Sequence, residues 1–336
     1  MKTYKNLFQN VCTFRTLNDA YMKARKGKHS RPEVVKFTYY LERELFILEK
    51  ELKNETYKTG RYRRFIIYEP KKREISALPF RDRVVQHGIC AVIEPIFEKQ
   101  FISDSYACRK NKGTHAGVAK LQKFIQGTGN SYYALKCDIS KYFSSINHDV
   151  LKKAVRRKIS DIRLLNLLDE IIVSASYGKG VPIGNLTSQL FANIYLNQLD
   201  EYVKYTLGVK YYLRYMDDFI ILHESKEHLH EIKDKIRNFL ASLFLTTHPT
   251  KTNIFPVSTG VDFLGYRIFV THRLARKSTV KRFIRNAKGQ IRNYEKGFVS
   301  YEKMIEFCNS WTAYLSHGNT YLLKNSLYNR YFKNVA

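Results

Sequence analysis

The sequence is poor in cysteine and contains no long apolar run. Its five cysteines are scattered and none belongs to a Cys-x-x-Cys pair, which argues against a zinc ribbon and against a disulfide framework. No segment approaches the roughly 20 apolar residues that are needed to span a bilayer. The polar N-terminal residues show no secretory signal. We therefore expect a reduced, cytoplasmic protein with no membrane partner.

Acidic residues are also scarce. The 336 residues include 58 Lys and Arg against 30 Asp and Glu, which gives a formal net charge of +28. A field of this size and sign favours polyanions, and nucleic acid before an anionic membrane surface. Hydrophobic residues make up 44% of the chain, so there is ample material for a large core and disorder is excluded as the main interpretation.

The hydrophobic pattern predicts an α+β protein. Residues 1–60 are mostly helical, and a hairpin with a basic tip at 69–73 follows, with strands at 64–68 and 74–78. Further helices are predicted at 81–99, 161–176, 188–207 and 229–243, and further strands at 132–137, 209–216, 219–222, 253–257 and 263–269. The order strand–helix–strand–strand–helix–strand is typical of a ferredoxin-like unit, an antiparallel sheet with helices on one side.

The last segment, 271–336, is predicted to be helical and basic, with 13 Lys and Arg against 3 Asp and Glu. An apolar stripe runs along its first helix at Val280, Phe283, Ile284, Ala287, Ile291 and Tyr294. A basic stripe lies beside it at Lys281, Arg285, Lys288 and Arg292. The alternative is an ordinary solvated face, but so few acids cannot pair with these cations, which favours contact with nucleic acid.

Three aspartates carry the strongest chemical signal. Asp217 and Asp218 are adjacent in a tight turn between two apolar strands, where like charges repel and raise each other's pKa. Acidic turns are common, so this pair alone is moderate evidence. Asp138 also ends an apolar strand, and in a ferredoxin-like sheet that strand can lie beside the turn. Three converging carboxylates suit Mg²⁺, and two such ions can support an in-line phosphoryl transfer.

These acids belong to a series of segments that resembles the reverse transcriptases over about residues 55–300. The similar segments are 73–87 and 105–115 for two fingers motifs, 138–143 for motif A, 215–218 for motif C, 247–252 for motif D and 263–266 for the primer-grip motif. The resemblance implies a right-hand polymerase with fingers, a ferredoxin-like palm and a helical thumb. The expected boundaries are 1–130 for the N-terminal helical region and fingers, 131–270 for the palm, with residual fingers elements near 150–182, and 271–336 for the thumb.

The resemblance also implies roles for the matching residues. Those implied to be catalytic are Asp138, Asp217, Asp218 and Lys251. Those implied to bind the deoxynucleoside triphosphate are Arg63, Arg73, Ile139, Phe143, Ile183, Gly184 and Gln189. Those implied to contact primer and template are Tyr215, Met216, Gly265, Lys281, Arg285, Lys288 and Arg292. Two Mg²⁺ ions, for which Mn²⁺ can substitute, are expected on the three aspartates and the Ile139 backbone oxygen. Core packing remains the alternative for Phe143, Tyr215 and Gly265, and a solvated charge for Arg63 and Lys251.

The segment from Ile183 to Gln189 departs from the usual pattern, since Ile183 replaces a Gln and Gln189 replaces a Pro. This variant is similar to the reverse transcriptases of diversity-generating retroelements. The resemblance implies cDNA synthesis from a template-repeat RNA with errors at adenines, for mutagenic retrohoming, and a small basic accessory protein as partner. Isoleucine cannot hydrogen-bond the incoming nucleotide, which predicts weaker discrimination unless Ile183 merely packs the following helix. The alternatives are a group II intron-like or phage-defence reverse transcriptase and a non-catalytic RNA-binding protein.

Overall fold

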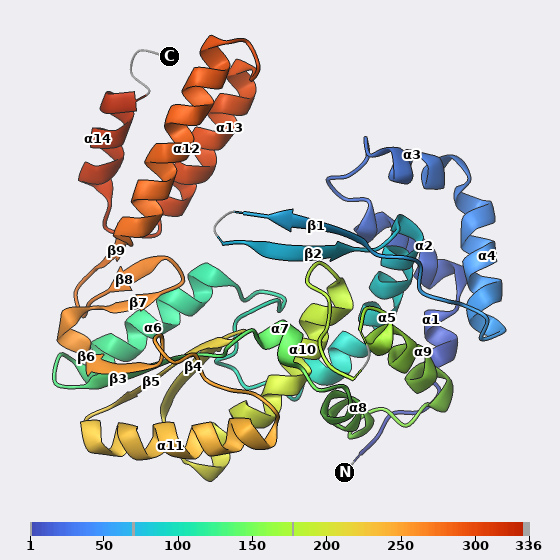
Figure 1. Ribbon diagram of the computed structural model, residues 1–336, viewed down its shortest axis with the longest axis horizontal. Coiled ribbons are helices and arrows are strands. Elements are labelled where there is room, and N and C mark those ends of the chain that lie inside the picture. The colour runs from blue at the N-terminus through green and yellow to red at the C-terminus, as the bar shows by residue number, and fades with distance from the viewer. Residues whose placement is uncertain (1, 69–70, 177, 332–336) are drawn as a thin grey trace.

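The computed structural model describes residues 2–68, 71–176 and 178–331 (Figure 1). Its first 60 residues are mostly helical, as predicted. The helices are α1 (Phe8–Val11), α2 (Phe14–Ala24), α3 (Pro32–Tyr39) and α4 (Leu41–Lys53). Leu45, Leu48 and Leu52 of α4 are buried. Their spacing of three and four residues puts them on one face of the helix, which packs against the core. α2 packs along α5 (Phe80–Glu98), the long helix that confirms the prediction at 81–99.

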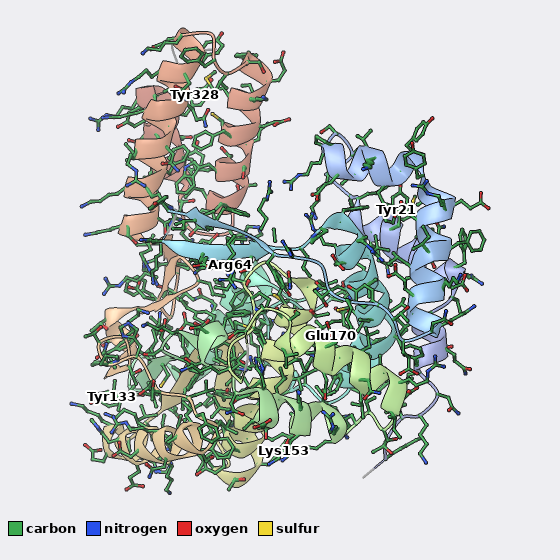
Figure 2. The ribbon with its side chains drawn as sticks, turned by 45° about the vertical axis from the view of Figure 1, so that its right-hand side comes forward. Tyr21, Arg64, Tyr133, Lys153, Glu170 and Tyr328 are labelled. Atoms are coloured by element: carbon green, nitrogen blue, oxygen red, sulfur yellow. The ribbon has the colours of Figure 1, made fainter. Side chains whose placement is uncertain are left out.

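The predicted hairpin is present as β1 (Arg63–Ile67) and β2 (Arg73–Ala77), which pair with each other and with no other described strand. Residues 69 and 70 of the expected basic tip lie outside the described residues. Arg64, labelled in Figure 2, donates to the carbonyl of Ala175 at 3.3 Å. In Figure 1 the hairpin projects from the N-terminal helices toward the base of α12 (Lys277–Glu295). The ribbon therefore reaches across the molecule instead of joining a larger sheet.

The central sheet has the ferredoxin-like topology that the sequence predicts. Its strands are β3 (Tyr133–Asp138), β4 (Tyr211–Tyr215), β5 (Asp218–His223) and β6 (Asn253–Pro256). They lie in the order β4-β5-β3-β6, and every neighbouring pair is antiparallel. The connecting helices are α7 (Tyr142–Ser145), α8 (His148–Arg156), α9 (Ile162–Val173), α10 (Leu186–Glu201) and α11 (Lys226–Ser242). A single π-helical turn, Tyr202–Thr206, extends α10 to the end of the predicted helix.

Helices cover both faces of this sheet, so the prediction of helices on one side was wrong. Leu135 and Phe219 pack in the main core together with α10 and α11. Ala134 and Ile220, which point to the opposite face, pack in a second core against α6 (Thr114–Thr128) and residues 261–268. The strands are apolar at successive positions, and such strands require cover on both faces.

The region after β6 differs from the prediction in two ways. The expected strand at 263–269 is a hairpin, β7 (Val261–Phe263) and β8 (Tyr266–Ile268), which turns at Leu264 and Gly265 with φ of 46° and 92°. The segment that was predicted to be helical from residue 271 begins with β9 (Arg273–Ala275), which pairs with β8. These three strands form a separate small sheet, and it joins the central sheet to the helical C-terminal part.

The C-terminal part consists of α12 (Lys277–Glu295), α13 (Tyr301–Leu315) and α14 (Tyr321–Tyr331). These helices stand apart from the rest of the molecule, with Tyr328 among them in Figure 2. They enclose a small core of their own, which contains Phe283 and Ala287 from the predicted apolar stripe of α12. The basic residues of α12 lie on its exposed side, as expected. Within the described ranges, every helix is too short or too polar to cross a membrane.

Candidate active site

Asp138 and Asp218 lie directly opposite each other on neighbouring antiparallel strands. Asp138 is the last residue of β3, and its register partner is Asp218, the first residue of β5. Asp217 precedes Asp218 in the tight turn from β4, and its carbonyl accepts a hydrogen bond of 3.2 Å from the Ile139 N–H. The sheet register therefore brings the three aspartates to one edge, as the sequence predicts.

The carboxylates of this edge are crowded and partly buried. The pKa of Asp218 is raised to about 6, chiefly by burial and also by the neighbouring Asp138 and Asp217, although Lys136 acts in the opposite direction. Burial and the charge of Asp138 also raise the pKa of Asp217. One oxygen of Asp218, Oδ1, is buried without a hydrogen-bond partner. Crowded carboxylates with an unpaired oxygen are a donor set that fits a hard cation.

Two lysines currently balance part of this negative charge. The Lys251 Nζ lies 2.9 Å from Asp138 Oδ1. The Lys136 Nζ lies 3.6 Å from Asp218 Oδ2 and donates to the Asp262 carbonyl at 2.7 Å. Sequence reasoning missed Lys136, although the two-residue period of a strand puts it on the same face as Asp138. No three His, Cys, Asp or Glu side chains in the described part of the chain are grouped as metal ligands.

The acidic edge opens into a basic groove. One cavity of about 560 Å³ is lined by Asp138, Asp218, Lys136 and Lys251. A second cavity, of about 880 Å³, continues along the start of α12. The second cavity is lined by cations, namely Lys71, Arg276, Lys281, Arg282 and Arg285. Lys71, Leu264, Gly265 and Arg276 line both cavities, so the groove runs without a break from the acids to the helical C-terminal part.

The two arginines that were predicted to hold a triphosphate lie at different places on the hairpin. Arg73 begins β2 and is close enough to Asp217 to lower the pKa of that carboxyl. Arg63 begins β1, four register pairs away, or about 13 Å along the strand. Its guanidinium lies over the Phe65 ring, 5.7 Å from the centroid. The structure therefore brings Arg73, but not Arg63, to the acidic edge.

Phe143 lies on α7, soon after Asp138 in the chain. Its side chain is half-buried against the main core, and its ring centroid is 5.6 Å from that of Tyr142. The Val181 N–H donates to its carbonyl at 2.8 Å, which joins α7 to the loop before α10. The side chain of Phe143 therefore takes part in core packing while it remains partly exposed.

The loop that contains Ile183 and Gly184 is attached to the hairpin. The Ser76 N–H of β2 donates to the Ile183 carbonyl at 2.9 Å. Gly184 has φ of +121°, and a Cβ there would lie only 3.1 Å from both the Ser76 carbonyl and Ile75, so this close approach favours glycine. Ile183 is half-buried beside β2, and Gln189 is exposed on the first turn of α10. The loop is therefore bonded to β2, the strand that begins with Arg73.

Three of the residues predicted to contact the primer, Tyr215, Met216 and Gly265, have close packing contacts within the protein. The Tyr215 hydroxyl lies 3.3 Å from Thr114 Oγ1, and Met216 is buried. Gly265 has φ of +92°, and a Cβ there would lie 2.6 Å from the Tyr314 hydroxyl. That hydroxyl donates to the Gly265 carbonyl at 2.7 Å. Glycine is therefore required at 265 by the close approach of α13 within the protein itself.

Comparison with known proteins finds one matching family and several similar individual proteins. The family described as "Reverse transcriptase (RNA-dependent DNA polymerase)" matches residues 58–268. Protein YkfC of Escherichia coli K12 is 31% identical over 319 residues, which cover 81% of this chain and 79% of YkfC. The group II intron-encoded protein LtrA of Lactococcus lactis is 24% identical over 307 residues, which cover 69% of this chain and 50% of LtrA.

A solved structure shows a similar fold. The apo telomerase from Candida tropicalis, truncated from its C-terminal domain, superposes with a TM-score of 0.51. The similarity covers 64% of this chain and 55% of that chain, at 16% sequence identity. At this identity the likeness concerns the arrangement of the elements alone.

Proposed function

Because this chain belongs to the reverse transcriptase family, we propose that it is an active RNA-directed DNA polymerase. Its α+β fold is that of a right-hand polymerase, with fingers, a ferredoxin-like palm and a helical thumb. In the proposed reaction a primer 3′-hydroxyl attacks the α-phosphorus of a deoxynucleoside triphosphate, and pyrophosphate leaves. The observation that carries the proposal is the register pair of Asp138 and Asp218 beside Asp217.

We assign the parts of the fold as the sequence suggests. Residues 1–130 form the N-terminal region and fingers, residues 131–270 form the palm, with fingers elements near 150–182, and residues 271–336 form the thumb. Support comes from the separate core of α12–α14 and from the groove that joins this region to the acidic edge. A template–primer duplex would lie along this groove, where Lys281, Arg285, Lys288 and Arg292 face its phosphates.

Divalent ions, when bound, would stabilise the charge on the attacking and leaving oxygens of the transfer. Asp138, Asp217 and Asp218 would hold two Mg²⁺ ions, with the Ile139 carbonyl as a further ligand, and Mn²⁺ could substitute. The unpaired Oδ1 of Asp218 and the raised pKa values support this assignment. Lys251 would give a proton to the departing pyrophosphate, and its Nζ at 2.9 Å from Asp138 Oδ1 supports this role.

The residues around the nucleotide would orient it and select its sugar. Arg73 can bind the triphosphate with two parallel N–H···O bonds, a geometry that guanidinium groups favour. Phe143 would lie against the deoxyribose and exclude a 2′-hydroxyl. Arg63 is assigned a weaker role, because the hairpin places it about 13 Å from Arg73.

The finer proposal is adenine-directed mutagenesis within a diversity-generating retroelement, with a template-repeat RNA and a small basic accessory protein as partners. Its support is the side chain of Ile183, which offers no hydrogen bond and sits beside the strand that begins at Arg73. The second candidate is a group II intron-like reverse transcriptase without this mutagenesis. The similarity to LtrA favours that candidate.

Primer extension tests the activity. We expect the protein, with its template RNA and any accessory protein present, to extend a DNA primer on RNA in Mg²⁺ and to stop when the ion is chelated. Absence of synthesis under these conditions would favour a non-catalytic RNA-binding protein.

Sequencing of the cDNA separates the two candidate functions. Errors concentrated opposite template adenines would support the retroelement, and an even distribution of errors would support the intron-like enzyme. In the first case Ile183→Gln should reduce misincorporation opposite adenine. The matched change Ile162→Gln lies on an exposed position of α9 and should leave the error spectrum unchanged.

A further inference from the structure

An ion pair beneath the Asp217 turn is fully buried. Arg214 on β4 and Asp200 on α10 both have side chains that are 0% exposed. The guanidinium donates from Nη2 to Asp200 Oδ2 at 2.6 Å and from Nε to Asp200 Oδ1 at 2.7 Å. Two parallel bonds fix the plane of the guanidinium and not only its position.

The remaining donor of this guanidinium points at the turn. Arg214 Nη1 donates to the Met216 carbonyl at 3.0 Å and to Asn193 Oδ1 at 3.3 Å. Met216 has φ of 56°, a left-handed conformation that costs energy for a residue with a side chain. The carbonyl that receives the bond belongs to the peptide that leads into Asp217. The buried guanidinium of Arg214 therefore fixes the peptide between Met216 and Asp217, which immediately precedes the Asp217 carboxylate.

The same network attaches the turn to two other parts of the molecule. Asn193 on α10 donates to the Ala107 carbonyl at 2.9 Å, and the backbone of Arg214 pairs with that of Asp104 and Tyr106. The Tyr212 hydroxyl donates to Asp200 Oδ1 at 2.7 Å. None of the side-chain atoms of Arg214 or Asp200 is among the unpaired buried polar atoms found in the described ranges.

Stability alone is a poor explanation for this pair. Apolar side chains of similar volume often replace a buried ion pair without loss of stability, because desolvation offsets the attraction of the charges. An apolar pair, however, cannot donate to the Met216 carbonyl. The charged pair of Arg214 and Asp200 therefore differs from an apolar pair in that it orients the turn at Met216 and Asp217.

We propose that Arg214 is a positioning residue, which acts through Met216 to hold the Asp217 carboxylate beside Asp138 and in fixed relation to α10. This inference rests on the proposed function, since it names a residue that prepares the same site. It concerns the geometry of the site rather than contact with substrate.

The test compares Arg214→Lys with the double change Arg214→Met/Asp200→Leu. The lysine keeps a positive charge beside Asp200 but lacks the planar guanidinium, whose separate nitrogens bind both oxygens of Asp200 and the Met216 carbonyl. The double variant removes both charges, and we expect its urea midpoint to lie close to that of the wild type. In both we expect kcat for primer extension to fall at least tenfold with KM for the primed template within twofold. The dissociation constant for Mn²⁺, measured by electron paramagnetic resonance, should rise at least threefold.

Tyr212→Phe is the matched control, because it removes a contact to Asp200 without touching the turn. It should change kcat and Mn²⁺ affinity by less than twofold. If Tyr212→Phe lowers kcat and Mn²⁺ affinity as much as Arg214→Lys does, the network has only a structural role and the inference fails. The inference also fails if Arg214→Lys keeps the kcat and the Mn²⁺ affinity of the wild type. If the wild-type protein makes no cDNA, the proposed function fails, whereas the Mn²⁺ measurement still decides the role of Arg214.

Discussion

The acidic edge of the central sheet and the exposed face of α12 use charge in opposite ways. At the edge, three carboxylates are placed by strand register and by buried bonds, and burial raises the pKa values of Asp217 and Asp218. On α12, the cations are exposed and spaced along one side, and only Phe283 and Ala287 of the helix are buried. The contrast teaches that bond-making chemistry requires fixed individual groups, whereas binding of a polyanion depends on the total charge of a surface.

The sharpest way to test this contrast is to remove one acid. Asp217→Asn should lower primer-extension kcat by about 10³-fold or more, because the transition state loses a charged ligand that no neighbour can replace. The variant should remain folded, since the amide relieves like-charge repulsion. The control is Asp234→Asn on α11, an exposed acid paired with Arg237. Steady-state kinetics on a primed RNA template measures both, and comparable losses in the two variants would contradict the assignment.

The protonation of Asp218 gives a second test. Its pKa in the folded protein is about 6, raised from 3.8, so the folded state binds the proton more tightly than the unfolded state does. Without metal, the stabilisation is complete below about pH 4 and is lost as the pH rises through 6, a change on the order of 3 kcal/mol. The affinity for Mg²⁺ should rise over the same window, because the ion binds the ionised carboxylate.

Urea unfolding in a chelator, from pH 4 to pH 7, measures the first effect. The wild type and Asp218→Asn should be similarly stable near pH 4, and the variant should become the more stable of the two as the pH rises. A constant difference across this window would show that Asp218 titrates normally.

Two glycines extend the comparison to the backbone. Gly265→Ala should lower the free energy of unfolding by about 1–3 kcal/mol, because φ is +92° and the new methyl group meets the Tyr314 hydroxyl. Gly289→Ala on α12 has open space around its Cβ and should stabilise the helix by about 0.5–1 kcal/mol. Denaturant unfolding gives both values. Equal effects at the two positions would show that the turn at Gly265 and the Tyr314 side chain can shift to accommodate the methyl group.

Single cations of α12 should have the smallest effect. Lys281→Ala and Lys288→Ala should each weaken binding of a primed RNA by a few-fold and reduce the slope of log K against log salt by about 0.7–0.9. Lys235→Ala, on the exposed side of α11, should leave the slope unchanged. A large, salt-independent loss in Lys281→Ala would mean that this face also contains individually placed groups.

Sequence pattern predicted the elements that obey a local period. The four strands of the central sheet, α11 and the two faces of α12 follow from spacing of two or about 3.6 residues. The meeting of Asp138 with Asp218 followed from the order of these elements, because a ferredoxin-like sheet has few alternative strand orders.

Contacts between distant segments could not be predicted in this way. The pairing of Arg214 with Asp200 depends on how α10 packs against β4, and nothing in either segment reveals it. The turn at Gly265 depends on the approach of Tyr314, almost fifty residues later in the chain. The packing of α6 against the second face of the central sheet could not be predicted either. The only sign of it in the sequence is the run of successive apolar residues in β5, which indicates that both faces of that strand are buried.

One backbone oxygen joins the two regions that have been compared. The Gly265 carbonyl accepts bonds from the Tyr314 hydroxyl at 2.7 Å and from the Arg276 N–H at 2.8 Å, both within the helical C-terminal part or its entrance. Gly265 itself lines the cavity that contains Asp138 and Asp218. A swing of the three-helix bundle would therefore pull on a peptide next to the acids. Under the proposed function, a change in how α12–α14 hold a duplex would therefore also move a peptide that lines the cavity of Asp138 and Asp218.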